Sequence, residues 1–66
     1  MSDPNVVEYY AGDELVAESE EMTEEAAVES IDDLLPYIEQ VVETPTHVEV
    51  LDVSEDGVRL VQEVDL

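Results

Sequence analysis

The chain has 66 residues, and 20 of them are Asp or Glu against a single Lys or Arg, so its formal net charge is −19 at pH 7. This length allows one domain. The absence of cysteine excludes a disulfide scaffold and a thiolate metal site, and one Arg cannot supply the cationic surface that binds nucleic acid. No apolar run approaches the roughly 20 residues that span a bilayer, and no basic segment precedes an apolar one, so we expect neither a membrane span nor a signal peptide.

The first part of the chain has the pattern of a weak β-hairpin. Residues 1–4 are expected to be frayed, and residues 5–18 carry the hairpin. The run from Val6 to Tyr10 is rich in β-branched and aromatic side chains that favour a strand, and Gly12 suits a turn. Residues 15–17 allow a second short strand. Disorder of this whole segment is the alternative.

A helix is predicted over about residues 23–43. Thr23 can cap its start, and two glutamates follow at the positive end of the helix dipole. Pro36 lies inside the pattern and removes a backbone donor, so we expect a kink there. The helical period itself rests on an apolar stripe with spacings of three, four and seven residues, namely Ala27, Val28, Ile31, Leu34, Leu35, Ile38, Val41 and Val42.

A second hairpin is predicted over about residues 46–65. Two valine-rich runs flank residues 54–57, which have the composition of a tight turn. We expect the register that places Asp52 opposite Arg59, because it brings the only Arg of the chain next to an acid. The same register pairs apolar residues on both faces, namely Leu51 with Leu60, Val53 with Val58, and Val50 with Val61.

The sequence therefore predicts a single α+β domain over residues 1–66, with the order β-β-α-β-β and one kinked helix on an antiparallel sheet. The alternative is an α-β-β fold with a disordered N-terminal segment. One helix covers only one face of the second hairpin. We expect the helix on the side of Leu51 and Leu60, which leaves Val48, Val50 and Val61 for the interface of a homodimer.

No residue pattern identifies a catalytic, cofactor or metal site. His47 is the only histidine and has no thiolate or second imidazole to share a metal ion, so we expect a half-exposed residue at the start of a strand. Residues 52–63 match the spacing of a calcium loop through Asp52, Asp56 and Glu63, but a β-branched run precedes them where that motif needs a helix. A hairpin turn is the preferred interpretation, and cation binding by these three acids is left open.

The acidic residues comprise 13 Glu and 7 Asp, spread over every segment of a chain without Lys, Phe or Trp. This composition resembles that of the small acidic proteins of haloarchaea. The resemblance implies a cytosol with molar salt, where the Debye length falls to about 3 Å and surface carboxylates scarcely repel one another.

We expect a non-enzymatic protein–protein interaction module, cytoplasmic and homodimeric, with no cofactor and neither nucleic acid nor a membrane as its partner. Two alternatives stay open. One is a mimic of nucleic acid that antagonises a basic protein. The other is a small ligand binder or enzyme formed at a dimer interface.

Overall fold

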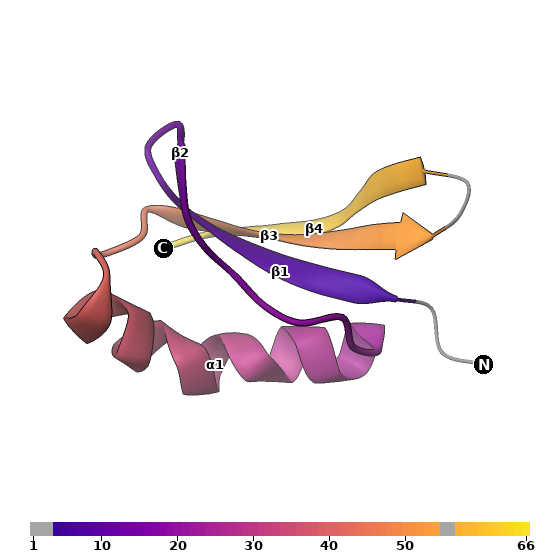
Figure 1. Ribbon diagram of the computed structural model, residues 1–66, viewed down its shortest axis with the longest axis horizontal. Helices are drawn as coiled ribbons and strands as arrows, with labels where there is room; N and C mark the ends of the chain where they lie inside the picture. The colour runs from indigo at the N-terminus through magenta and orange to yellow at the C-terminus, as the bar shows by residue number, and fades with distance from the viewer. Residues whose placement is uncertain (1–3, 55–56) are drawn as a thin grey trace.

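The computed structural model describes residues 4–54 and 57–66 and shows one helix on a four-stranded antiparallel sheet (Figure 1). The element order β-β-α-β-β is confirmed. The sheet order is β2-β1-β3-β4, so β1 is an inner strand, and the alternative with a disordered N-terminal segment is wrong. The elements are β1 (Asn5–Ala11), β2 (Glu14–Glu18), α1 (Glu24–Val41), β3 (His47–Ser54) and β4 (Gly57–Asp65).

The first hairpin turns at Gly12, whose φ of 66° is a conformation that favours glycine. The Gly12 N–H donates to Thr46 Oγ1 at 2.8 Å, which ties this turn to the segment that enters β3. Pro4, expected to be frayed, instead accepts a hydrogen bond from the Val53 N–H at 3.0 Å. The pairing of β1 with β3 thus extends beyond the first strand residue, and residues 1–3 lie outside the described part of the chain.

Helix α1 begins where its sequence predicts. The Thr23 hydroxyl accepts a hydrogen bond from the Ala26 N–H at 3.2 Å, and Glu24 and Glu25 follow in the first turn. The helix is continuous through Pro36. Pro36 and Asp32 both lie on the exposed side, so water can bond the Asp32 carbonyl that loses its helical donor. The kink stays a prediction.

The second hairpin has the predicted register near its turn and a different one further along. Asp52 lies opposite Arg59, with Asp52 Oδ2 and Arg59 Nη2 3.3 Å apart. A β-bulge then shifts the register, so that Val50 lies opposite Gln62 and not Val61. The bulge lets Val61 turn toward the helix side, where it packs against the core. The predicted turn includes residues 55 and 56, which lie outside the described residues.

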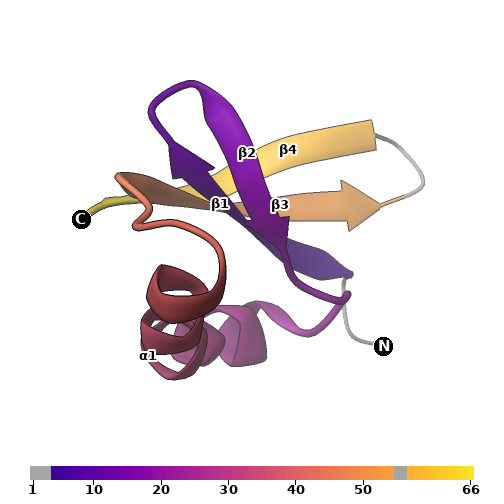
Figure 2. The same ribbon diagram turned by 60° about the vertical axis from the view of Figure 1, so that its left-hand side comes forward.

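The core lies between α1 and one face of the sheet, and all of α1 is on that side (Figures 1 and 2). We call this the inner face and the opposite one the outer face. The fully or nearly buried residues of the core are Val7, Tyr9, Ala27, Ile31, Ile38, Val48 and Val50.

The predicted dimer interface is wrong in its choice of face. Val48 and Val50 are 0% exposed beneath α1 and so are not open to a partner, and Val61 is partly buried against the same core. The uncovered pair is Val58 and Leu60, which are 69% and 52% exposed. Both hairpin faces are apolar, and the sequence of the hairpin alone does not distinguish the face that the helix covers.

Among the described residues, one buried side-chain polar atom lacks a hydrogen-bond partner. The Tyr9 side chain is 1% exposed, and its hydroxyl makes no hydrogen bond with any described residue. Burial raises the pKa of this phenol above its ordinary value, because the charged form is poorly solvated there. A buried hydroxyl without a partner loses its hydration and regains nothing, at a cost of about 1–3 kcal/mol.

We therefore predict that Tyr9→Phe stabilises the protein. The ring keeps its packing and the unpaired hydroxyl is removed, so the free energy of unfolding should rise by about 1 kcal/mol. Chemical denaturation at high salt measures the change. The matched control is Tyr37→Phe, because Tyr37 is 62% exposed and its hydroxyl is free to meet water. A loss of stability in Tyr9→Phe alone would show that the hydroxyl has a partner in solution.

Candidate functional site

The outer face of the sheet is divided into an apolar part and a charged part. The apolar part, here called the apolar end, consists of Val6, Leu51, Val53, Val58 and Leu60. These residues are opposed in adjacent strands, Val6 to Leu51, Leu51 to Leu60, and Val53 to Val58. Val6 and Leu51 are buried by their neighbours, whereas Val58 and Leu60 are exposed. On β1, β3 and β4, the next outward-facing position after the apolar end is a glutamate.

Four glutamates form a row that crosses the entire sheet. Glu18 on β2 is opposite Glu8 on β1, Glu8 is opposite Glu49 on β3, and Glu49 is opposite Glu63 on β4. We call this set the glutamate row. Neighbouring strands lie about 4.8 Å apart, and like charges directly opposite each other destabilise a sheet. The row therefore concentrates negative potential along one line of the outer face.

The titration of two groups reflects this potential. The Tyr10 hydroxyl donates to Glu8 Oε1 at 2.5 Å, and this bond, together with burial and the charges of Glu8, Glu49 and Glu18, raises the Tyr10 pKa to about 12. The pKa of Glu18 is also raised, first by its hydrogen bond with Glu8, then by burial and by the Glu8 charge. The raised pKa means that the Glu18 carboxyl keeps its proton to a higher pH than an isolated glutamate does.

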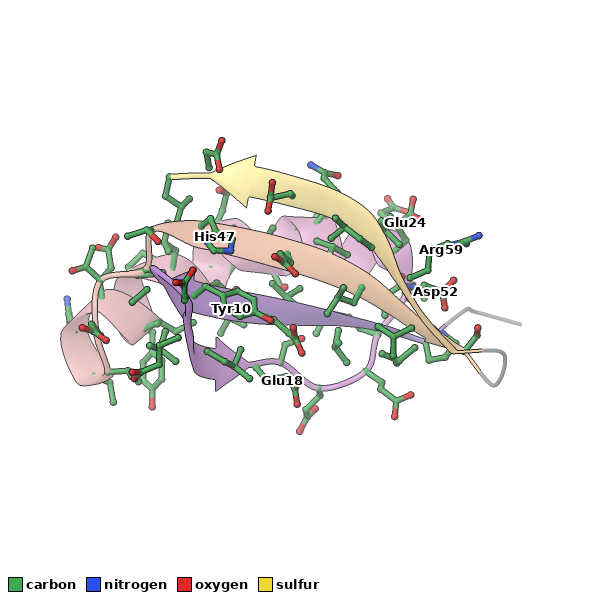
Figure 3. All side chains as sticks on the ribbon, turned by 90° about the horizontal axis from the view of Figure 1, so that it is seen from above. Tyr10, Glu18, Glu24, His47, Asp52 and Arg59 are labelled. Carbon is green, nitrogen blue, oxygen red and sulfur yellow. The ribbon has the colours of Figure 1, made fainter. Side chains whose placement is uncertain are left out.

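His47 lies beside the row and is held by an aromatic neighbour. Its imidazole stacks on the Tyr10 ring with centroids 4.9 Å apart and planes 3° from parallel, and Figure 3 shows the two side by side on β1 and β3. His47 Nε2 is 3.4 Å from Glu49 Oε2, which is an ion pair when the imidazole is protonated. The position agrees with the predicted half-exposed residue at the start of a strand.

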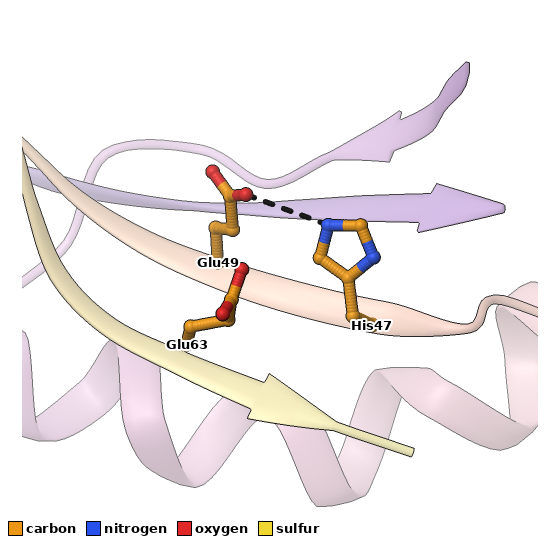
Figure 4. A group of neighbouring side chains, drawn as sticks. All are labelled: His47, Glu49 and Glu63. Carbon is orange, nitrogen blue, oxygen red and sulfur yellow. Dashed lines mark ion pairs between the residues drawn. The ribbon is translucent and has the colours of Figure 1, made fainter. Parts of the chain in front are cut away.

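Glu63 completes a compact group with these two residues. One ligand atom from each of His47, Glu49 and Glu63 lies within 4.8 Å of the others (Figure 4). Imidazole nitrogen and carboxylate oxygen are both ligands of divalent cations. The sequence shows no hint of this group, because Glu63 comes from the other strand of the hairpin and reaches Glu49 only after the register shift at the bulge.

The three acids of the calcium-loop pattern do not form one site. Asp52 is nearly buried, binds Arg59 and accepts a hydrogen bond from the Ser54 N–H at 3.1 Å. Glu63 lies opposite Glu49 on the outer face, whereas Asp52 alternates to the inner one. Asp56 lies outside the described residues. Asp52 and Glu63 on opposite faces of a sheet cannot share one cation, so the pattern in the sequence is that of a hairpin.

Comparison with known proteins gives no relative for this chain. No protein-family model, no curated protein and no solved structure matches it. In residues 4–54 and 57–66, no helix has the length and apolar character needed to cross a membrane.

We predict that the Tyr10 hydroxyl titrates near pH 12 and that Glu8→Gln lowers this value toward the ordinary 10.0. The amide accepts a weaker hydrogen bond than the carboxylate and carries no charge. Because the folded pKa is raised, the stabilisation is complete below pH 10.0 and is lost as the pH rises toward 12. The ring carbon signals of Tyr10, followed by NMR, report the titration. Glu39→Gln on α1 has the same charge change and should leave the Tyr10 curve unmoved.

Proposed function

We propose that the protein is a non-enzymatic interaction module that pairs with a second copy of itself through the apolar end, in the salt-rich cytosol of a haloarchaeon. The observation that carries this proposal is the exposure of Val58 and Leu60 on a face that no described element covers (Figure 1). They continue a surface begun by the buried Val6 and Leu51. A partner that covers this surface would complete a second apolar layer.

The distribution of charge on the outer face favours one orientation of the second copy relative to the first. The outward-facing residues of β3 and β4 beyond the glutamate row are Leu51, Val53, Val58 and Leu60, and none is charged. A two-fold axis that runs across the strands through the apolar ends reverses the strand direction in the second copy. The two glutamate rows then lie on opposite sides of the interface, as far apart as the face allows.

The size of the chain supports the same conclusion. A single core in a domain below about 70 residues rarely contributes more than about 3–5 kcal/mol, so association adds stability that the chain lacks alone. A specific interface buries about 800 Å² of each partner. This is roughly a fifth of the 4472 Å² of accessible surface of the chain, an area within the scale of one sheet face.

The two alternatives have less support. A nucleic-acid mimic needs its carboxylates gathered on one ridge, whereas exposed acids here occupy α1 as well as the outer face of the sheet, among them Glu25, Glu29 and Asp33. A binder or enzyme assembled across the interface needs polar groups inside it. The pairing through the apolar ends leaves the glutamate row outside.

The double variant Val58→Thr/Leu60→Gln tests the interface. It removes apolar surface without adding charge, so the dissociation constant of the dimer should rise at least about tenfold, as expected for the loss of about 1.4 kcal/mol of binding energy. Sedimentation or light scattering at high salt over a concentration series measures it. The control is Tyr37→Gln/Val41→Thr on α1, whose residues are comparably exposed, and it should dissociate like the wild type.

Two outcomes contradict the proposed pairing. A wild-type protein that stays monomeric at several hundred micromolar has no such interface. A dimer weakened only by the α1 variant pairs through the helix instead, which would transfer the interface to Tyr37 and Val41.

The haloarchaeal setting makes a separate prediction, because screening relieves repulsion among the carboxylates. The thermal midpoint should rise steadily from about 0.1 M to about 3 M KCl as the Debye length falls from about 10 Å to under 3 Å. Circular dichroism follows the helix signal of α1 during heating. Replacing KCl by sucrose separates charge screening from general exclusion of cosolvent. A midpoint that does not change with KCl contradicts the haloarchaeal setting.

A further inference from the structure

We propose that His47, Glu49 and Glu63 form a site for one divalent transition-metal cation of the zinc or cobalt type. The group combines one imidazole and two carboxylates from adjacent strands on the outer face (Figure 4). It is separate from the apolar end, so the inference does not depend on the proposed dimer.

The geometry of the group fits such an ion. Two ligands that each lie about 2.1 Å from a tetrahedral zinc ion are about 3.4 Å apart. His47 Nε2 and Glu49 Oε2 are separated by 3.4 Å. The ligand atoms of all three residues lie within 4.8 Å of one another, and Glu63 is exposed, so a change of its rotamer brings its carboxylate to the ion. Three protein ligands leave a fourth position for water.

The imidazole is oriented before any ion binds. Tyr10 stacks on its ring in a nearly parallel arrangement, and the Tyr10 hydroxyl is itself tied to Glu8. The side chain of His47 therefore has little rotamer freedom to lose on binding. Nε2 already faces Glu49, so the ring needs no turn to present a nitrogen to the ion. Preorganisation of this kind distinguishes the group from a set of mobile surface acids.

The charge around the group favours a cation. Glu49 and Glu63 are members of the glutamate row, in which each acid is opposed directly by another. The only Arg of the chain, Arg59, pairs with Asp52 near the turn of the hairpin, away from His47 (Figure 3). An ion held between Glu49 and Glu63 would replace their mutual repulsion by attraction to a common positive charge.

The ligand set selects the class of ion. Magnesium and calcium prefer oxygen ligands alone, whereas imidazole suits zinc, cobalt and nickel. Binding that depends on His47 therefore separates a transition-metal site from the diffuse cloud of counterions that −19 charges attract in any salt.

The test is a calorimetric titration of the full chain with zinc chloride in high KCl. We expect one zinc ion per chain, and an affinity at least about tenfold weaker in His47→Gln and in Glu63→Gln. The matched control is Glu24→Gln, which makes the same charge change as Glu63→Gln at the start of α1 (Figure 3). It should bind zinc as the wild type does. Circular dichroism checks that each variant is folded.

A second measurement needs no substitution. The imidazole nitrogen signals of His47 in the wild-type protein should shift on addition of one equivalent of zinc and stay in place with the same amount of magnesium. The proposal is overturned if the wild type binds no zinc, if the imidazole signals do not move, or if Glu24→Gln weakens binding as much as His47→Gln does. The last result would identify the uptake of zinc as general attraction to the acidic surface.

Discussion

Two cross-strand pairs, Val7 with Val50 and Tyr9 with Val48, determine which face of the sheet each of the remaining residues of β1 and β3 occupies. They bury four side chains between β1, β3 and α1 with almost no exposed surface. Because side chains alternate along a strand, burial of these four sends Glu8, Tyr10, His47 and Glu49 to the outer face. The apolar packing under the helix thus assembles the charged surface on the other side, and a slip of one residue in β1 or β3 would exchange the two.

This arrangement imposes an electrostatic cost at one place. Ten of the 17 acids that the structure describes lie exposed on α1 or in connecting segments, where water surrounds them. The glutamate row instead holds four carboxylates at the spacing of adjacent strands. Side-chain contacts next to the row offset part of this repulsion. Tyr10 donates a hydrogen bond to Glu8, and His47 Nε2 lies 3.4 Å from Glu49 Oε2. The first contact lies within β1 and the second within β3, and the stacking of Tyr10 on His47 links them across the pairing of the two strands.

Local features of the fold can be predicted from the sequence, and features that depend on distant pairing cannot. The helix follows from a stripe of period 3.6 and from Thr23, and the register near the second turn follows from Asp52 opposite Arg59. The choice of face does not follow, since the second hairpin is apolar on both sides and only the contact of Val48 and Val50 with α1 decides it. The glutamate row is equally invisible, because Glu8 and Glu49 are 41 residues apart in the chain.

The bulge in β4 has a consequence for how this chain can vary. Before it, Val58 and Leu60 face outward, and after it Glu63 and Asp65 do, so the outward positions change from even to odd numbers at the extra residue. If the bulge were lost at unchanged length, strict alternation would turn Glu63 and Asp65 under the helix and Val64 into water. Deletion of Val61 or Gln62 would instead remove the extra residue and leave Glu63 and Asp65 on the outer face. The outward placement of the β4 acids therefore depends on the bulge and its extra residue being kept or removed together, and a bulge lost at unchanged length would place two carboxylates against the apolar core.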